Sequence, residues 1–581
     1  MTFTPTSEQR KFINHLGSVY VKACPGAGKT HTIVNRLKKR LSEMEGRNNG
    51  IAILSFTNSA IQELIEKSHK EEIMGKLQYP SFIGTFDSFI WRFIGLFTIP
   101  IKSQIKPTLV ETWDGIYLND FGNRCIKGKG ISLSNFNPFN KDFNLKGETA
   151  ETQRIVNRYK NEYIKQAKFK LQELSRDGYY SISDIRKLVD EALLDEQFSS
   201  CLGAIMQKRF QEIIVDEAQD CNKIDISILK WLKNSGIPII VVCDPGQAIY
   251  EFRDSTPQEL KNFASNFSDQ IILDGNFRSS AVICKLSSTL RDDIQTDKAL
   301  GKFNEVEEPI RIITYSSKRS VPMSVGEVFM TIASADSLGL SKDDLISFAH
   351  DKRSSMRAAG VVPQNETESQ SKRFLLAKAV TDFKNFYHND RIRKNSLISV
   401  MKIILEAGGF LTKNEYWQKA LQKYPPGERE LHRSALEIIG NLAETCDAEQ
   451  AEDWIEKAKL NFNKYIITSP HKSIHTFFKK SKDWYTPLMR AGKDGQILKY
   501  STIHESKGRE YLGVLLSIKP GNEAKIIFDL WGDRKIQEEI RVLYVGVTRA
   551  IRLLAIAIHD SNIEIVKNIL IKNNIPFLIE K

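Results

Sequence analysis

The sequence predicts an α/β protein with parallel sheets, on three observations. Short apolar runs alternate with helical segments along most of the chain. A glycine-rich turn follows the first apolar run, and a pair of acidic residues directly follows a later one. Because each connecting helix crosses back over the sheet before the next strand begins, this alternation favours parallel sheets with helices on both faces.

The first sheet is expected from two separate blocks of sequence. The first block has strand patterns at 18–23 and 51–56, and the second has them at 212–216 and 237–244. Between the blocks, 91–203 is loop-rich at first and then helical and basic. We therefore expect 91–203 to be a mainly helical insertion in a first lobe formed by 1–90 and 204–273.

A second sheet is expected in the same way. Strand patterns return at 310–315 and 345–348, and strand–helix alternation resumes at 498. The segment 364–492 is mostly helical and polar. The sequence therefore predicts a second lobe formed by 274–363 and 493–581, interrupted by a helical insertion at 364–492.

Size, composition and charge limit which class of protein this chain can belong to. The chain has 581 residues, which at roughly 100–200 residues per folding unit indicates about three to five units. Hydrophobic residues make up 41% of it, which is too many for a disordered chain. The formal net charge of +12 is compatible with a nucleic-acid partner and equally with a soluble basic enzyme.

Several classes are disfavoured. The seven cysteines form no C-x-x-C pair and no Cys/His cluster with metal-ligand spacing, so we expect neither a zinc site nor an iron–sulfur cluster. Scattered cysteines in a large chain suit a reducing cytosol. No signal-peptide pattern and no run of about 18 apolar residues are visible, so we expect a cytoplasmic protein without a membrane span.

The glycine-rich turn has the pattern of a phosphate-binding loop. Its sequence, between a strand pattern and a helix pattern, is Ala23-Cys24-Pro25-Gly26-Ala27-Gly28-Lys29-Thr30. The glycines allow backbone N–H groups to face a phosphate, and the helix N-terminus adds partial positive charge. Lys29 would hold the β- and γ-phosphates of ATP and the Thr30 hydroxyl would ligate Mg²⁺. Ala23 stands where the strict pattern has glycine, and an ordinary glycine turn is the alternative.

The acidic pair is Asp216-Glu217, after the apolar run Ile213-Ile214-Val215. A nucleotide-hydrolysing site needs one carboxylate on Mg²⁺ and another that polarises the attacking water. Asp216 suits the first role and Glu217 the second. By itself, such a pair more often marks the solvated end of a strand. Together with the upstream phosphate-binding loop, it indicates a catalytic pair.

Besides the phosphate-binding turn, eight segments in family order resemble motifs of the UvrD/Rep/PcrA family of superfamily 1 helicases. They are 6–9 (TSEQ), 55–58 (SFTN), 84–86 (GTF), 215–220 (VDEAQD), 244–253 (DPGQAIYEFR), 275–279 (GNFRS), 502–511 (TIHESKGREY) and 543–550 (LYVGVTRA). The resemblance implies two RecA-like P-loop NTPase lobes with parallel sheets, each carrying a mainly helical insertion. The second insertion looks shorter than in the larger relatives. Compact anti-phage defence members of the GajB type are similar in size and motif style.

The resemblance implies an ATP site and a catalytic set. Gln9 would bind the adenine edge, Phe277 would stack on adenine and Glu510 would hydrogen-bond the ribose. The ATP-binding residues are then Gln9, Pro25, Gly26, Ala27, Gly28, Lys29, Thr30, His31, Phe277, Arg278, Glu510 and Arg549, and the Mg²⁺ ligands are Thr30 and Asp216. The implied catalytic residues are Lys29, Glu217, Gln247, Arg278 and Arg549. Gln247 would sense the γ-phosphate, and one or both arginines would be arginine fingers, worth about 10³–10⁵ in rate.

The resemblance also nominates DNA-binding residues. They are Phe56, Thr57, Asn58, Thr85, Phe86, Phe252, Arg253 and His504. The three phenylalanines would stack on or wedge between bases, and the others would contact the backbone. Core packing is the alternative for each phenylalanine. The basic helical segment 154–170 would contact duplex phosphates or form a solvated helix face.

Together these features imply an ATP-dependent single-stranded DNA translocase or helicase, 3′→5′ by family, that acts on single strands and single-strand/duplex junctions. The alternative is an ATP- and DNA-binding switch subunit that gates a partner nuclease and unwinds little by itself. A third interpretation, an RNA helicase, predicts stimulation by RNA and not by DNA. Four residues depart from the family pattern, Asp87, Ala248, Glu251 and Phe252. They leave open how tightly the DNA-binding track is built.

Overall fold

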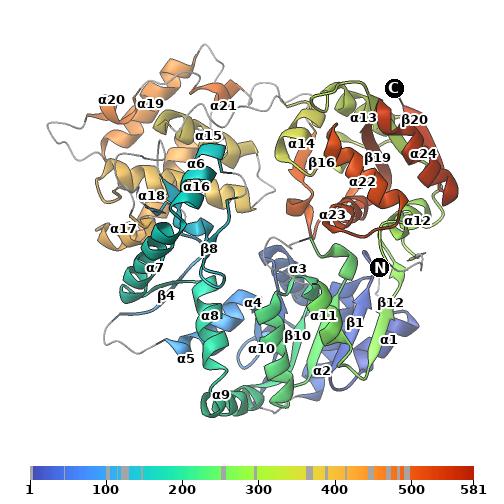
Figure 1. Cartoon of the computed structure of the whole chain (residues 1–581), viewed down its shortest axis with the longest axis horizontal. Coiled ribbons are helices and arrows are strands. Elements are labelled where there is room, and N and C mark those ends of the chain that lie inside the picture. Colours follow the sequence, from blue (N-terminus) through green and yellow to red (C-terminus); the bar gives the residue numbers. More distant parts are fainter. Residues whose placement is uncertain are drawn as a thin grey trace. The chain divides into compact units, whose positions relative to one another are not determined.

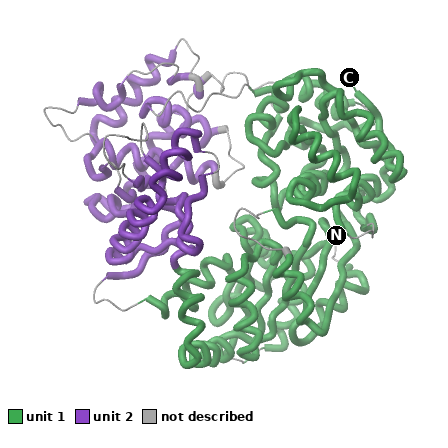
Figure 2. The backbone as a smooth tube through the Cα atoms, in the orientation of Figure 1, with its two compact units in different colours: residues 1–101, 185–363, 498–581 green, residues 102–184, 364–497 purple. Residues whose placement is uncertain are grey.

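The structure of the chain is a computed structural model, in which two compact units are distinguished (Figure 2). Unit 1 comprises 1–101, 185–363 and 498–581, and unit 2 comprises 102–184 and 364–497. The residues that the structure describes are 4–44, 46, 48–99, 105–113, 115–118, 130–145, 148–249, 257–292, 297–335, 337–361, 371–385, 390–412, 415–442, 450–465, 473–479, 484–489 and 498–580.

The first lobe of unit 1 is built on a parallel sheet whose described strands are in the order β12-β1-β11-β10-β2-β3 (Figure 1). These strands are apolar on both faces because helices cover both faces. Helices α1, α2 and α3 pack against one face, through Phe12, Ile33 and Leu64 among others. The strands are β12 (Gln270–Leu273), β1 (Val19–Ala23), β11 (Ile239–Cys243), β10 (Phe210–Val215), β2 (Gly50–Ser55) and β3 (Phe82–Thr85).

The helices of the first lobe begin at recognisable caps. The Thr6 and Gln9 side chains form a capping box at the start of α1, and Asn222 and Asp225 form one at the start of α10. The helices and short turns are α1 (Ser7–Asn14), α2 (Lys29–Glu43), α3 (Asn58–Lys70), η1 (Met74–Leu77), α4 (Phe86–Ile90), η2 (Trp91–Gly95), α5 (Leu96–Thr98), α8 (Ile182–Ala192), α9 (Glu196–Arg209), η4 (Ala218–Asp220), α10 (Lys223–Asn234), η5 (Pro245–Gln247) and α11 (Pro257–Ala264).

The second lobe is built on another parallel sheet, with described strands in the order β17-β16-β18-β19-β15-β20. Its two faces carry separate apolar clusters, one with Phe528 and Tyr544 and the other with Phe329. The strands are β17 (Lys499–Thr502), β16 (Leu345–Ala349), β18 (Tyr511–Ser517), β19 (Ala550–His559), β15 (Ile310–Tyr315) and β20 (Phe577–Glu580), and β13 (Gly275–Asn276) pairs separately with β14 (Lys298–Ala299).

Helices cover both faces of this second sheet (Figure 1). The helices and short turns are α12 (Ala281–Ser288), α13 (Ser324–Ser334), η7 (Lys342–Asp344), α14 (Lys352–Ala358), η10 (His504–Ser506), α22 (Asn522–Gly532), α23 (Glu538–Val547), η11 (Asp560–Asn562) and α24 (Ile563–Lys572).

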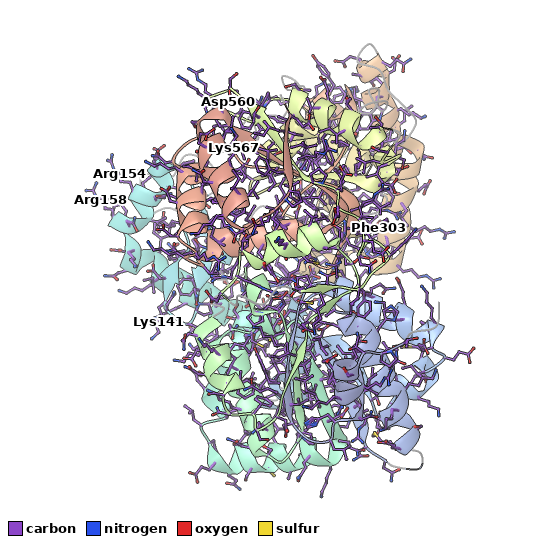
Figure 3. All side chains as sticks on the ribbon, turned by 90° about the vertical axis from the view of Figure 1, so that its right-hand side faces the viewer. Lys141, Arg154, Arg158, Phe303, Asp560 and Lys567 are labelled. Atoms are coloured by element: carbon purple, nitrogen blue, oxygen red, sulfur yellow. The ribbon has the colours of Figure 1, made fainter. Side chains whose placement is uncertain are left out.

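Unit 2 joins segments from both expected insertions into one body. Tyr416 is buried in the apolar cluster formed by the earlier segment, where its ring meets those of Trp113 and Tyr179 at centroid distances of 5.7 Å. Arg154 and Arg158 lie on the exposed face of α6 (Figure 3). The elements are β4 (Thr108–Val110), β5 (Tyr117–Leu118), β6 (Ile131–Ser132), η3 (Leu133–Asn135), β7 (Phe136–Asn137), β8 (Asp142–Phe143), α6 (Ala150–Arg158), α7 (Lys160–Arg176), β9 (Tyr179–Ser181), α15 (Lys372–Asn385), α16 (Asp390–Ala407), α17 (Trp417–Lys423), α18 (Gly427–Leu442), α19 (Ala451–Asn463), α20 (Ile474–Phe477) and α21 (Thr486–Met489).

The predicted α/β fold class with parallel sheets is confirmed. The division into four sequence blocks stays a prediction. The structure groups the two lobes into one unit and the helical segments into another, and its first boundaries fall at 101/102 and 184/185. The first part of 91–203, expected to be loop-rich, contains the short strands β6, β7 and β8 among its described residues. Among the described residues, no helix is both long and apolar enough to span a bilayer.

Candidate functional site

The strand order brings four of the sequence motifs to one edge of the first sheet. Strand β1 lies between β11 and β12, and β10 lies next to β11. All four strands are parallel, so the segments that follow them emerge at the same edge. These segments are 24–28, 216–220, 244–249 and 274–279. In open parallel sheets, ligands bind at the carboxyl ends of the strands.

The phosphate-binding turn has the backbone that its glycines allow. Gly26 and Gly28 have φ angles of 70° and 69°, in the left-handed region that favours glycine. Gly28 directly precedes the first residue of α2, Lys29. The Lys29 ammonium lies 3.1 Å from the Glu217 carboxylate, and both side chains are largely buried. Burial opposes the charged form of Lys29, but the surrounding carboxylates, Glu217 first, raise its pKa above the ordinary value.

The two carboxylates after β10 have different environments. Burial, reinforced by the charge of its neighbour Glu217, raises the pKa of Asp216. Burial also opposes the charge of Glu217, but the ammonium groups of Lys29 and Lys507 outweigh it and lower the pKa of Glu217. Glu217 also has a φ of 56°, an uncommon conformation for a residue with a side chain. The two neighbouring carboxylates thus differ in proton affinity.

The second lobe reaches the phosphate-binding turn directly. The Phe277 backbone N–H donates to the Gly26 carbonyl at 2.8 Å. A Cβ atom on Gly26 would lie 2.6 Å from both the Arg278 Cβ and the Asn276 Oδ1. Two features therefore require glycine at position 26: its positive φ and the close approach of the segment 276–278, which leaves no room for a Cβ atom.

Arg278 is held by neighbours of its own lobe. Its Nε donates to the Glu510 carboxylate at 2.6 Å and its Nη1 donates to the Thr548 carbonyl at 3.0 Å. The Asn276 side chain accepts from the Arg278 backbone N–H at 2.8 Å. Glu510, which the motif resemblance implies as the ribose ligand, here binds a guanidinium instead. Phe277, the expected adenine-stacking residue, is 39% exposed.

Arg549 reaches across the contact between the two lobes of unit 1, which we call the seam. Its Nη2 donates to the Gln247 Oε1 at 2.8 Å, and its Nε donates to the Val545 carbonyl at 3.0 Å. Arg549 is fully buried, and burial together with the nearby Arg278 lowers its pKa to about 10. Among the described residues, no carboxylate forms a salt bridge with Arg549, and a buried guanidinium in such a site favours the arrival of an anion.

Other contacts across this seam involve residues that the sequence analysis did not single out. The Lys507 ammonium bridges both oxygens of the Asp220 carboxylate at 2.6 Å, and both side chains are almost fully buried. The Arg541 Nε donates to the Ala248 carbonyl at 2.7 Å. Lys507 also donates to the Gln247 carbonyl at 3.2 Å. Asp220 and Lys507 lie inside quoted motifs, so motif membership was the signal that could have identified them.

The residues present fit a bound ATP–Mg²⁺. Mg²⁺ is commonly held by one or two protein oxygens together with substrate phosphates and water. Here the Asp216 carboxylate directly follows a strand, and Thr30 is the second residue of α2. Within the described residues, no cluster of three or more His, Cys, Asp or Glu side chains could hold a metal ion by itself. This donor set suits a metal that arrives with phosphates.

The remaining expected nucleotide residues are placed as follows. Gln9 is buried, its Nε2 donates to the Ala27 carbonyl at 2.9 Å, and its Oε1 accepts from the Thr6 N–H at 2.9 Å. The Gln9 amide keeps one N–H and one lone pair for a base. Pro25 and Ala27 lie in the turn itself and are buried, whereas His31 is exposed on the first turn of α2.

The expected DNA residues of the first lobe follow β2 and β3. Phe56 is half-buried and stacks on Phe86 at 5.2 Å between ring centroids. Phe86 is fully buried and also packs against Phe89, so its ring lies in the core and offers no face to a base. Thr57 and Thr85 cap α3 and α4 through their side chains. Asn58 is exposed.

In the second lobe, His504 follows β17 and its ring lies 5.5 Å from that of His350, which follows β16. A Cβ atom on Gly508 would lie 3.6 Å from the Ser59 Oγ, so the loop after β17 faces the helix after β2. Phe252 and Arg253 lie outside the described residues, so their placement stays a prediction. The functional roles of all the site residues also stay predictions.

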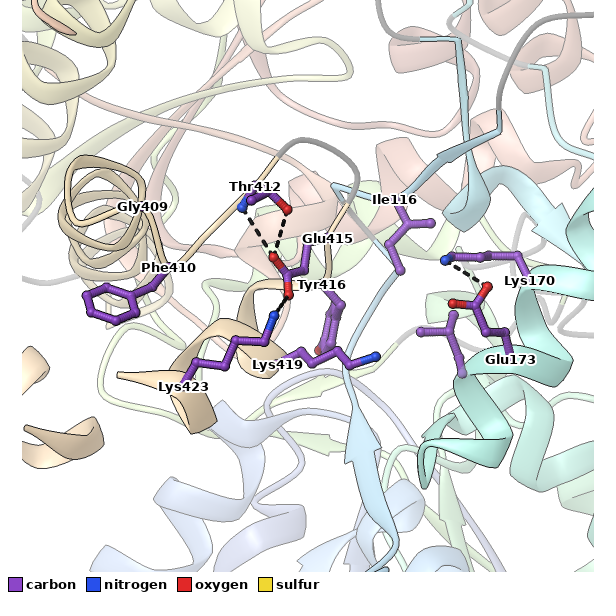
Figure 4. A pocket seen from close by; sticks show the side chains of 11 residues that line it. Ile116, Lys170, Glu173, Gly409, Phe410, Thr412, Glu415, Tyr416, Lys419 and Lys423 are labelled. Atoms are coloured by element: carbon purple, nitrogen blue, oxygen red, sulfur yellow. Dashed lines mark hydrogen bonds and ion pairs between the residues drawn. The ribbon is translucent and has the colours of Figure 1, made fainter. Parts of the chain in front are cut away.

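A separate cavity lies within unit 2 (Figure 4). It has a volume of about 410 Å³. Each of its lysines is paired with a carboxylate: Lys170 with Glu173, Lys423 with Glu415 and Lys419 with Asp177. Because these charges already neutralise one another, the cavity is a poor candidate for binding a charged ligand.

Comparison with known proteins concerns the first half of the chain. The UvrD/REP helicase N-terminal domain family matches residues 5–268. The ATP-dependent DNA helicase PcrA of Staphylococcus epidermidis is 26% identical over 273 residues, which cover 45% of this chain and 36% of that protein. PcrA of Staphylococcus aureus is 26% identical over 276 residues, which cover 46% of this chain and 37% of that protein.

The matched stretch thus spans little more than a third of these relatives. The residues that the family model matches, 5–268, contain the phosphate-binding turn, Asp216, Glu217 and Gln247, whereas Arg278 and Arg549 lie beyond them. The resemblance that the motifs indicated is confirmed over residues 5–268, which match the UvrD/REP helicase N-terminal domain family.

Proposed function

We propose that the chain is an ATP-dependent DNA helicase that moves along single-stranded DNA. One observation carries the proposal: Lys29 and Glu217 from the first lobe lie at the same seam as Arg278 and Arg549 from the second. Positive charge on both sides of one phosphate-binding turn is the arrangement that phosphoryl transfer requires. The family of residues 5–268 supports the same activity.

ATP would supply the γ-phosphoryl group, and the chain's own residues would position and stabilise it. Lys29 would leave Glu217 and bind phosphate oxygens, and Thr30 and Asp216 would hold Mg²⁺. Glu217, released from Lys29, would orient the attacking water. Gln247 would contact the γ-phosphate, and Arg549 would turn from Gln247 toward the developing charge.

Movement along DNA would follow from closure of the seam. If ATP binds the closed seam more tightly than the open one, binding closes it and hydrolysis lets it open. Phe56, Thr57 and Asn58 on one lobe and His504 on the other would then grip the strand alternately, with Phe252 and Arg253 completing the track. By family the direction is 3′→5′, on single strands and single-strand/duplex junctions, in the cytoplasm, for DNA repair or phage defence.

The test is ATP hydrolysis with and without single-stranded DNA, followed by unwinding of duplexes with a 3′ or a 5′ tail. We expect turnover that DNA stimulates, and unwinding with the 3′ tail. Lys29→Ala and Glu217→Gln should reduce turnover at least 10³-fold, whereas Lys38→Ala, on an exposed surface, should not. Wild-type turnover in Lys29→Ala would reject the site.

One observation favours a second candidate function. Phe86 is fully buried, so the track has fewer aromatic faces than its motifs implied. An ATP- and DNA-binding switch that gates a partner nuclease needs DNA binding without processive movement. DNA-stimulated ATP hydrolysis without unwinding by the isolated chain would support the switch, and robust unwinding would reject it.

A further inference from the structure

A buried glutamine links the carboxylate expected to orient water to the neighbouring strand end. The Gln219 Nε2 donates a hydrogen bond to the Glu217 Oε2. The Gln219 Oε1 accepts from the Asp244 backbone N–H at 3.1 Å. Both ends of the amide are therefore used, and only 2% of the residue is exposed. This fixes the amide orientation, because a flipped amide would place two acceptors together at Glu217.

The chain of hydrogen bonds continues across the seam. The Asp244 Oδ2 accepts from the Gln247 Nε2 at 2.8 Å and from the Tyr544 hydroxyl at 3.3 Å. The Gln247 Oε1 accepts from the Arg549 Nη2 at 2.8 Å. Beginning at Lys29, an unbroken series of side-chain and backbone bonds joins the phosphate-binding turn to the second lobe.

We propose that Gln219 is a positioning residue that ties the orientation of Glu217 to the seam contact of Gln247 and Arg549. The proposal rests on the proposed ATP hydrolysis. If Arg549 moved away from Gln247, the Gln247 side chain would be free to change its hydrogen bond to the Asp244 carboxylate. Because the Asp244 backbone N–H donates to Gln219, that change would reach Gln219. The Glu217 carboxylate would then be held differently in the open and the closed seam.

Two physical features support this role. Glu217 has a positive φ, so its backbone conformation must be maintained by surrounding contacts. A buried hydrogen bond to a carboxylate is stronger than a neutral one, and networks of such bonds act together. Gln219 makes that bond, and Glu217 accepts its other bond from Lys29, which a nucleotide would take away.

The first test is Gln219→Leu, which keeps the size of the side chain and removes both hydrogen bonds. We expect kcat for ATP to fall at least tenfold, about 1.4 kcal/mol, while the Kd for a fluorescent ATP analogue changes less than twofold. Gln207→Leu, at an exposed position of α9, is the matched control and should change neither. Equal losses in kcat and in nucleotide binding would mean that Gln219 only supports the fold, and would overturn the proposal.

The second test asks whether Gln219 and Gln247 act as one unit. If they do, the variant Gln219→Leu with Gln247→Leu should be about as slow as the slower single variant. If they act separately, their fold-losses should multiply, and the link between them would be rejected.

A measurement without ATP separates this proposal from the proposed function. Melting temperatures of the wild type, Gln219→Leu, Arg549→Met and the double variant give a double-mutant cycle across the seam. A combined shift clearly smaller than the sum of the two single shifts supports the link even if the wild type hydrolyses no ATP. Additive shifts would overturn the link even if hydrolysis is robust.

Discussion

Two contacts in this molecule join segments that are far apart in the sequence, and they are built in opposite ways. The seam between the lobes of unit 1 uses buried polar groups, with Lys507 on Asp220 and Arg549 on Gln247. The contact inside unit 2 uses an apolar anchor, Tyr416, and its ion pair between Lys394 and Glu111 lies at the surface.

The difference indicates what each contact can do. A buried polar contact is favourable only while every partner is in place, so an arriving anion can rearrange it. An apolar contact has no such alternative partner, since moving it only exposes its surface to water. We therefore expect the seam to respond to nucleotide and the Tyr416 contact to stay closed.

The largest expected effect is at the seam. Lys507→Ala removes the ammonium group that contacts both oxygens of the buried Asp220 carboxylate, which should cost about 3–5 kcal/mol of stability. Asp220→Leu with Lys507→Met should restore much of that loss but not ATP turnover. Urea unfolding and turnover measure both. A single variant as stable as the wild type would show that the seam is open in solution.

The next effect is in unit 2. Tyr416→Ala removes a buried ring from the contact with Trp113 and Tyr179 and should cost about 3 kcal/mol. Leu460→Ala, at a site that is 76% exposed, is the control and should be nearly neutral. ATP turnover at low temperature should be unchanged in both. Loss of turnover in Tyr416→Ala would contradict the separation of the two contacts.

A smaller effect tests how closely the lobes meet. A Cβ atom on Gly246 would lie 2.7 Å from the Tyr544 ring, so Gly246→Ala should cost about 1–3 kcal/mol. Gly440→Ala is the matched control, because its Cβ would meet nothing within 4 Å and it lies within α18. The control should be neutral or stabilising, by up to about 1 kcal/mol. Equal melting temperatures for the two variants would mean that Tyr544 does not press on Gly246.

The smallest effect is expected at the surface of unit 2. Lys394 pairs with Glu111 at 2.6 Å, but the two side chains are 57% and 80% exposed. Lys394→Ala should therefore change stability by less than about 1 kcal/mol, and less still at high salt. A loss as large as that of Lys507→Ala would remove the contrast between the buried and the exposed pairs.

The fold class was predictable because it follows from local patterns of apolar residues in the sequence. Strand patterns such as 310–315 are apolar on both faces, and only a sheet covered on both sides needs that. The order of the strands was not predictable in this way. It depends on which apolar surfaces pack together, and no local pattern encodes that choice.

By itself the sequence determined the chemical groups: the phosphate-binding turn with Lys29, the carboxylates after β10, and Arg278 and Arg549 within their motifs. Only the tertiary structure decided what each group touches. It put Phe86 in the core, tied Arg278 to Glu510 and made Gln219 a bridge between two strand ends. The physical reason is that side-chain identity is a local property, whereas burial and hydrogen-bond partners are set by the packing of distant segments.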